Sequence, residues 1–181
     1  TALNSIVIPA SVTSIDNQAF RNTTALVSFT VDGANPSYSS TSGVLFNKNS
    51  TTLIAYPLGK NNTFYAIPTS VTSIGDSAFY NATALNSIVI PASVTSIGRY
   101  TFSDATSLTS VTIPASVTSI GDYAFGSQAF LTTVSFESGS KLTTIGTGAF
   151  SQAYALTSIA IPASVTTIRA YTFSNNTALT T

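Results

Sequence analysis

Ile90-Pro91-Ala92-Ser93-Val94-Thr95-Ser96-Ile97 is the stretch that decides the fold, because the same phrase returns along the chain. It stands unchanged at Ile8–Ile15 and Ile113–Ile120, and near copies stand at Ile67–Ile74 and Ile161–Ile168. Each copy is followed by Ala-Phe or Thr-Phe and then by a leucine that recurs every 23 residues, as at Leu85, Leu108 and Leu131. A fixed period of about 20 to 50 residues is typical of stacked repeats. We therefore predict a mainly β repeat solenoid with about 23 residues per turn.

One repeat shows how this pattern forms strands. In the repeat that begins at Leu108, Val111 and Ile113 fall on one face and Ser110 and Thr112 on the other, which predicts a short half-buried strand. The proline that follows has no N–H and ends the strand. The next Val-Thr-Ser-Ile predicts a second short extended segment. Because strands at the same place in successive turns point the same way, they must pair in parallel.

Two further positions are predicted to shape the turn and the core. Gly121, which has counterparts in most other copies, suits a turn that requires a positive φ, although Asp16 and Arg169 at the same place show that the requirement is not strict. Phe125, like the phenylalanine of the other copies, is predicted to fill the interior. Each buried large apolar side chain contributes about 1.5–3 kcal/mol, but one turn alone leaves both of its flat faces wet. Three or more turns must therefore stack.

The surface is predicted to be rich in hydroxyl groups and poor in charge. Ser and Thr make up about a third of the 181 residues, whereas 7% are charged, and the formal net charge is zero. Nucleic acids and anionic membranes attract clustered Lys and Arg, so neither is an expected partner. The apolar runs are interrupted within a few residues, far short of the about 20 that span a bilayer. We expect no membrane insertion.

The sequence offers little chemistry for catalysis. It contains no histidine and no cysteine, which removes the usual general base, catalytic triads and thiolate metal sites. The paired carboxylates of a glycoside hydrolase lie about 5–10 Å apart in a cleft. Asp76 and Asp122 are instead two repeats apart, with Arg99 at the equivalent place between them. We interpret this column as alternating surface charge, and we expect no enzyme activity and no cofactor or metal.

Six copies of the repeat resemble the leucine-rich repeats of the BspA-like, or treponemal, type over nearly the whole chain. The resemblance lies in the repeat length, the Ile-Pro-x-Ser-Val-Thr phrase, the glycine and the Ala-Phe pair; many members also have a cysteine soon after Ala-Phe, which this chain lacks. The resemblance implies a right-handed arc with a parallel sheet of short strands on its concave side. It also implies a non-enzymatic protein, extracellular or at the cell surface, that takes part in adhesion or host interaction.

The repeat is interrupted at about 32–62. From Ile8 to Ile67 is 59 residues, which is 36 more than one repeat. Within the surplus, the apolar runs at 44–46 and 53–56 flank a polar stretch, which predicts a hairpin.

This interruption bears on both organisation and function. We expect residues 1–181 to form a single solenoid, a fragment of a longer array, that contains one elongated, hairpin-bearing repeat. Insertions in solenoids often lie on the binding face, so the hairpin is one candidate for ligand contact. The alternative is that it only packs its own Phe46, Tyr38 and Tyr56.

Outward-facing hydroxyls and a few tyrosines are the candidate ligand contacts. Stacked turns would align the hydroxyls in ladders, although uncharged β-branched residues also fit a parallel sheet for structural reasons alone. Tyrosines two residues before the core phenylalanine would form an aromatic stripe able to stack on sugars, or would be half-buried against the next turn. The candidates are Ser28, Thr30, Ser87, Ser110, Thr112, Thr133, Ser135, Ser158, Tyr56, Tyr100 and Tyr123.

We therefore expect a non-catalytic recognition or adhesion module that binds protein or glycan through its concave sheet or its hairpin. Two alternatives remain: a structural spacer without a ligand, and binding of ice or another regular surface through the Ser and Thr ladders. Exposed strand edges and apolar layers at the two ends also predict end-to-end association of chains.

Overall fold

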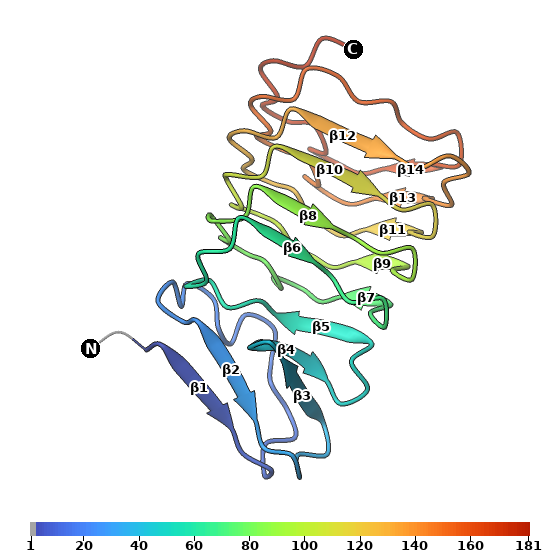
Figure 1. The fold of residues 1–181 in the computed structure, drawn as a ribbon. Coiled ribbons are helices and arrows are strands. Elements are labelled where there is room, and N and C mark those ends of the chain that lie inside the picture. The colour runs from blue at the N-terminus through green and yellow to red at the C-terminus, as the bar shows by residue number, and fades with distance from the viewer. Residues whose placement is uncertain (1–2) are drawn as a thin grey trace.

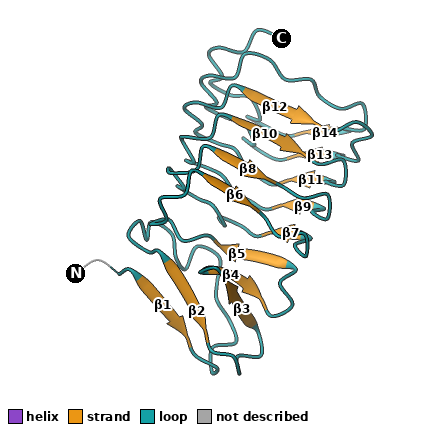
Figure 2. Cartoon of the chain, in the orientation of Figure 1, coloured by secondary structure: helices purple, strands orange, loops and turns teal. Residues whose placement is uncertain are grey.

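The computed structural model describes residues 3–181 and arranges them as a single stack of turns, with the two ends of the chain at opposite ends of the stack (Figure 1). Strands are joined by loops and turns (Figure 2), and the prediction of an all-β solenoid with a period of about 23 residues is confirmed. The strands are β1 (Ser5–Ile8), β2 (Ser28–Val31), β3 (Tyr38–Thr41), β4 (Val44–Asn47), β5 (Thr52–Ala55), β6 (Phe64–Ala66), β7 (Ser73–Ile74), β8 (Ser87–Val89), β9 (Ser96–Ile97), β10 (Ser110–Ile113), β11 (Ser119–Ile120), β12 (Thr133–Phe136), β13 (Thr144–Ile145) and β14 (Thr167–Ile168).

The strands form two walls of the stack. The first strand of each repeat lies in one wall, where β1 pairs with β2, β6 with β8 and β10 with β12, all in parallel. In the regular repeats the second segment is only two residues long as a strand, yet these short strands, together with the four-residue strands β5, β4 and β3, build the longest sheet, in the order β14-β13-β11-β9-β7-β5-β4-β3. The wall built by the second segments is therefore more continuous than the wall built by the first strands.

A column of stacked aromatic rings runs through the core. The rings of Phe79, Phe102, Phe125 and Phe150 are buried and lie nearly parallel to their neighbours, with centroids 5.1–5.4 Å apart. Tyr56 extends the column beyond Phe79, toward the N-terminal part of the stack, since its ring lies 5.1 Å from that of Phe79. Each ring covers the flat face that the next turn would otherwise leave wet, which is why a single turn is not stable by itself.

The repeated glycine has a different role from the predicted one. The glycines with positive φ are Gly43, Gly139 and Gly148, so Gly121 and its counterparts do not adopt the left-handed conformation. A Cβ on Gly121 would lie 2.6 Å from the carbonyl carbon of Gly98 in the preceding turn. The position favours glycine because the backbones of adjacent turns approach closely, although Arg169 occupies it in the last turn.

Left-handed residues do occur in each turn, two positions after this glycine and again four residues later. In the turn that follows β9, they are Tyr100 and Asp104, with φ of 53° and 59°. The same two positions in other turns carry Asn, Ser, Gln, Tyr or Gly, and Asn and Asp adopt this conformation more readily than most residues. The turns are therefore held in a regular shape that polar residues permit.

The elongated repeat contains three antiparallel strands. Where the sequence predicts a hairpin, β4 pairs antiparallel with β5, and β3, which was not predicted, pairs with β4 on its other side. We call these three strands, residues 38–55, the meander. β5 then pairs in parallel with β7, so the meander closes one end of the long sheet (Figure 1).

The meander separates two hydrophobic cores. Val44 and Phe46 belong to the large core that runs through the regular turns, whereas Leu45 between them belongs to a smaller core with Phe29 and Tyr38. All three residues of this apolar run are buried because each face of the strand has its own core. The apolar side chains of the first repeat thus pack on the meander and not in the large core of the regular stack.

Candidate functional site

The predicted hydroxyl ladder lies on the outside of the first wall. Its residues are paired in register, with Ser110 opposite Thr133 and Thr112 opposite Ser135. Seven of the eight hydroxyl candidates are exposed, and Ser28 is half-buried. We call the seven exposed residues the hydroxyl wall; they are Thr30, Ser87, Ser110, Thr112, Thr133, Ser135 and Ser158.

The two walls differ in what their hydroxyls bind. On the long sheet, the hydroxyl of Thr95 donates to the carbonyl of Thr72, and Thr118 donates to Thr95, at 3.2 and 3.1 Å. The hydroxyl protons of these threonines are therefore already engaged in hydrogen bonds within the fold. In the described residues of the hydroxyl wall, the side chains make no such bond to the backbone, and the one recorded contact is Thr132 to Thr133 at 3.5 Å. Its hydroxyls face solvent and are available to a ligand.

Apolar side chains share the hydroxyl wall. Phe64 on β6 stands opposite Ser87 and is 53% exposed, and Val89 beside it is 49% exposed. The surface therefore combines hydroxyls with exposed apolar groups and has no charged side chain on its strands β6, β8, β10 and β12. Uncharged surfaces of this kind can bind proteins or sugars.

The tyrosine candidates fall into two classes. Tyr100 and Tyr123 are half-buried and stack on each other, with centroids 5.1 Å apart and planes 5° from parallel. Gly148 lies against the ring of Tyr123, where any Cβ would clash with it. Tyr56 is 4% exposed and belongs to the large core, so it does not lie on the outer surface as a ligand-contact candidate would. Phe46 and Tyr38 of the meander are buried as well.

The acidic column stabilises the turns. The carboxylate of Asp76 accepts a hydrogen bond from the backbone N–H of Arg99 at 2.7 Å, and Asp122 accepts one from Thr147 at 2.8 Å. Arg99 and Asp122 also form an exposed ion pair with an N–O distance of 3.6 Å. Exposed pairs contribute little. Each of these two carboxylates connects its own turn to the following one.

The regular turns are joined by a repeated set of three backbone hydrogen bonds. In one example, the N–H groups of Ser77, Phe79 and Asn81 donate to carbonyls of the next turn at 2.8–2.9 Å, and later turns repeat the set. Between the first turn, residues 16–22, and the turn at 75–81, the described residues make no such backbone bond. The stack therefore lacks one set of these backbone hydrogen bonds at this place.

The absence of this set of hydrogen bonds has a cause in the sequence. Tyr56 takes the place of the core phenylalanine, because its N–H donates to Ala78 as that of Phe79 does to Thr101. Leu53 takes the place of Ile74, with which it pairs. Tyr56 is therefore three positions after Leu53, whereas Phe79 is five positions after Ile74. The outward turn of the elongated repeat is two residues short, and it does not reach between its neighbours.

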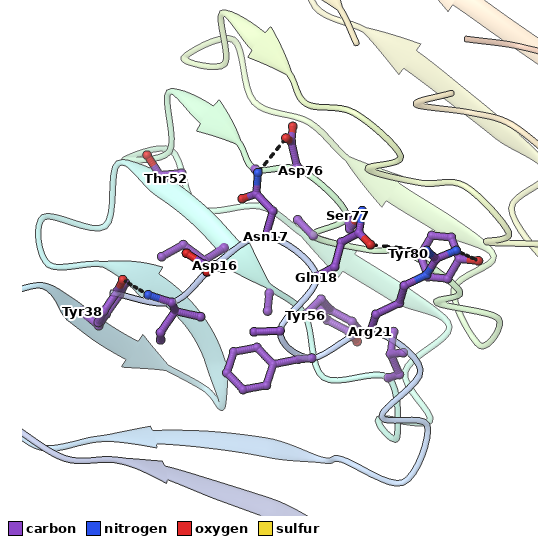
Figure 3. A pocket seen from close by; sticks show the side chains of 18 residues that line it. Asp16, Asn17, Gln18, Arg21, Tyr38, Thr52, Tyr56, Asp76, Ser77 and Tyr80 are labelled. Atoms are coloured by element: carbon purple, nitrogen blue, oxygen red, sulfur yellow. Dashed lines mark hydrogen bonds between the residues drawn. The ribbon is translucent and has the colours of Figure 1, made fainter. Parts of the chain in front are cut away.

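A pocket of about 150 Å³ occupies this gap (Figure 3). Side chains of the two flanking turns reach toward one another across it: Asn17 donates to Asp76 at 3.0 Å and Arg21 donates to the hydroxyl of Tyr80 at 2.6 Å. Phe20 of the first turn, Tyr56 of the shortened turn and Ser77 also line the pocket.

Two hydroxyls in the lining of this pocket are buried and unpaired. The Oη of Tyr56 and the Oγ of Ser77 have no hydrogen-bond partner among the described residues. Burial raises the pKa of Tyr56, so its hydroxyl stays protonated at neutral pH and can donate as well as accept. Leaving a buried hydroxyl unpaired costs about 1–3 kcal/mol. Both oxygens are shielded from solvent, so neither faces the open space of the pocket.

Sequence reasoning selected Tyr56 but not the pocket that it lines. The available signal was the 23-residue spacing from Tyr56 to Phe79, together with the shortened path from Leu53. The first-turn residues 16–21 carried no signal, because their neighbour in space is 59 residues away, as in the bond from Asn17 to Asp76.

Other features of the described chain limit the chemistry. Residues 3–181 contain no group of three or more side chains placed to hold a metal ion. The same residues include no helix of the length and apolar character needed to cross a membrane. β14 forms the outer edge of the long sheet, and its Ile168 is 51% exposed. End-to-end association through this edge stays a prediction.

The sequence comparisons agree with these observations. The family described as BspA type leucine rich repeat region, in six copies, matches residues 1–64 and 58–180. Comparison with curated proteins gives no match.

Several solved bacterial proteins have a similar fold. A leucine-rich repeat protein from Eubacterium ventriosum is 31% identical, with a TM-score of 0.83 over 99% of this chain and 54% of that one. The pneumococcal vaccine antigen PcpA is 25% identical, with a TM-score of 0.83 over 98% of this chain and 44% of that one. A leucine rich cell surface protein from Faecalibacterium prausnitzii is 30% identical, with a TM-score of 0.62 over 99% and 47%. This chain spans about half the length of these relatives.

Proposed function

Because the chain belongs to the BspA-type leucine-rich repeat family, whose members are bacterial surface proteins and generally non-enzymatic scaffolds, we propose that it is an extracellular recognition or adhesion module. Its ligand is a protein or a glycan of another cell or of the surrounding matrix. The relatives support a surface location, since one is a vaccine antigen and another is described as a cell surface protein.

The observation that carries this proposal is the hydroxyl wall. Its side chains are exposed and uncharged, and their hydroxyls are not used by the fold, whereas the threonine ladder of the long sheet donates to the backbone of the preceding turn. Exposed apolar side chains such as Phe64 and Val89 add contact area to the same face. A rigid stack holds these groups in register across several strands, which lowers the entropy lost on binding.

The test is a substitution of one column of the hydroxyl wall. The variant carries lysine at Ser87, Ser110, Thr133 and Ser158, which replaces neutral hydroxyls with four charges across the face. Binding of the purified chain to panels of immobilised matrix proteins and glycans is measured by surface plasmon resonance. We expect at least one ligand for the parent chain and a loss of more than tenfold in affinity for the variant.

A control variant carries the same added charge elsewhere. Asn61, Thr69, Ala92 and Ser138 are exposed and lie outside the strands, so lysines there leave the hydroxyl wall intact. The control should bind like the parent chain. If the parent chain binds no member of either panel, a spacer role replaces recognition. If both lysine variants lose binding equally, the face is not the site.

A further inference from the structure

The wall formed by the first strands is interrupted between β2 and β6 (Figure 1). The segments that lead into these two strands are joined, since the N–H of Gly59 donates to the carbonyl of Leu26 at 2.7 Å. From there the strands separate, and no Cα atom of β6 lies within 8 Å of one in β2. Neighbouring strands of a sheet lie about 4.8 Å apart. The side of β6 that faces away from β8 is therefore an open strand edge.

The meander causes this separation. The turn between β3 and β4 occupies the edge of β2, where the N–H of Phe29 donates to the carbonyl of Gly43 at 2.9 Å and that of Val31 donates to Ser40 Oγ at 3.1 Å. No Cα atom of β3, β4 or β5 lies within 8 Å of one in β6. The inserted strands thus pair with β2 and leave β6 without a neighbour on that side.

The backbone groups at this edge belong to Phe64 and Ala66. On the other side of the strand, the carbonyl of Thr63 accepts from Ser87 at 3.1 Å and the N–H of Ile67 donates to Val89 at 3.0 Å, so both face β8. Alternate residues of a strand direct their backbone groups to the same neighbour, which places Phe64 and Ala66 on the open side. Among the described residues, β6 pairs with β8 alone, and no other backbone group bonds to these two residues.

The edge is exposed and unprotected. Phe64 is 53% exposed and Ala66 is also exposed. The inward residue Tyr65 is half-buried, whereas its counterparts Ile88 and Val111 are buried. Natural proteins protect open edges with charged side chains, prolines or bulges, and residues 61–67 contain neither a charge nor a proline. The free donors and acceptors of this edge are therefore accessible to another chain.

We propose that β6 binds an extended segment of a partner protein, which pairs with it as an added strand. The free N–H and C=O groups alternate at the spacing of a strand, and the backbone of another extended polypeptide matches that spacing. The segment carries uncharged side chains, with an apolar residue that packs on the uncovered side of Tyr65. A second copy of the chain is not the occupant, because its own β2 would have to enter the same interruption of the wall.

This inference rests on the recognition function proposed above and narrows the ligand to a protein with an extended segment. It uses backbone groups of β6, whereas the hydroxyl wall uses side chains. Lysine at Ser87, Ser110, Thr133 and Ser158 leaves the open edge unchanged. The two proposals can therefore fail separately.

The first test is amide hydrogen exchange of the ¹⁵N-labelled chain, measured by NMR. In the free chain, the amides of Phe64 and Ala66 should exchange at least about tenfold faster than that of Tyr65, which faces β8. Equal protection of all three amides would mean that the edge is already paired, and it would overturn the proposal.

The second test adds two synthetic peptides with blocked ends that copy residues 85–91 and 108–114, since these segments have the alternation of the wall strands. Pairing along one edge is weak, so concentrations extend to about 2 mM. At least one peptide should slow exchange at Phe64 and Ala66 in a saturable way, and scrambled peptides should not. Absence of saturable protection with both peptides overturns the proposal.

Ala66→Pro is the decisive variant, because it removes one free N–H and keeps the bonds to β8. Proline is tolerated on the open side of an edge strand. The variant should bind the peptide at least tenfold more weakly, and Phe64→Pro, which removes the other free N–H, should do the same. Ala66→Val and Phe64→Val keep the N–H groups and should bind like the parent chain. Parent-like affinity in both proline variants overturns the proposal.

The four-lysine variant of the hydroxyl wall separates the two proposals. It should bind the peptide as the parent chain does, even when it loses ligands of the matrix and glycan panels. Ala66→Pro should in turn lose the protein ligands of the parent chain and keep any glycan ligand. A parent chain that binds glycans alone, with no protection of β6 by either peptide, overturns the edge proposal and leaves the recognition function in place.

Discussion

The regular stack and the junction at the meander contain the same kinds of residues but differ in how completely their groups are paired. Between the turns at 75–81 and 98–104, three backbone hydrogen bonds, a capping carboxylate and a stacked ring pair join neighbours. At the junction, no backbone hydrogen bond joins the described turns at 16–22 and 75–81; two side-chain bonds take their place, and two hydroxyls are left unpaired. Identical turns complete one another, whereas a shortened turn leaves polar groups without partners.

Removing a ring from the aromatic column should cause the largest effect. Phe102 is 1% exposed and stacked between Phe79 and Phe125, so Phe102→Ala leaves a cavity with rings on both sides. We expect a loss of about 4 kcal/mol in the free energy of unfolding, measured by urea denaturation.

The corresponding change at the junction should cost less. Phe20 is half-buried and packs on Phe29 in the smaller core, so Phe20→Ala should cost about 2 kcal/mol or less. Equal losses for Phe20→Ala and Phe102→Ala would contradict the distinction between the two cores.

The close approach of adjacent backbones is tested at Gly121. A Cβ there would lie 2.6–2.7 Å from backbone atoms of Gly98 and Arg99, which cannot move away without breaking the ladder. We expect Gly121→Ala to cost about 3 kcal/mol. Gly33→Ala is the matched control, because no atom lies within 4 Å of its Cβ position, and it should stay within about 0.5 kcal/mol of the parent chain. An unchanged free energy of unfolding in Gly121→Ala would show that adjacent turns can move apart.

Tyr56→Phe should have a smaller effect of opposite sign. It removes a buried hydroxyl without a partner and keeps the ring on Phe79, so the free energy of unfolding should rise by about 1 kcal/mol in the absence of ligand. Thermal unfolding measures the change, and Tyr65→Phe should leave the midpoint nearly unchanged. A destabilised Tyr56→Phe would mean that the hydroxyl already has a partner, such as a bound water.

The regular part of this fold was predictable because the residues that form each strand, turn and core position recur in every repeat. The alternation in Ser110–Ile113 gave the inward and outward faces, and the Ala-Phe pair gave the core column. The hairpin was predictable from two apolar runs around a polar one. β3 was not, because Tyr-Ser-Ser-Thr has one apolar residue and forms a strand only where the edge of β4 is available.

The role of the glycine and the pocket were harder to predict for physical reasons. A sequence does not distinguish a glycine that needs positive φ from one that another backbone approaches, and Gly121 is of the second kind. The pocket depends on an absence, namely two residues missing between Leu53 and Tyr56. Its other side comes from the first turn, which becomes a neighbour only after the meander has folded between them.

The weakest expected difference between the two regions concerns alkaline pH. Burial, and then repulsion from Tyr56, raise the pKa of Tyr65 to about 12, and burial also raises that of Tyr56. In the unfolded chain both ionise near the ordinary value of about 10. Below that pH both states hold the protons and stability is unaffected. From pH 10 to about 12 the unfolded state releases protons that the folded state keeps, so stability falls as pH rises.

Comparison of variants isolates this effect from other groups that titrate at high pH. The melting temperature is measured from pH 8 to 11 for the parent chain, Tyr65→Phe and Tyr154→Phe, the last of which removes an exposed ring. Tyr65→Phe should show a shallower decline above pH 10, while Tyr154→Phe should follow the parent chain. Parallel curves for all three would mean that the ring of Tyr65 becomes hydrated before it ionises. The packing at the junction would then be looser than that of the regular stack.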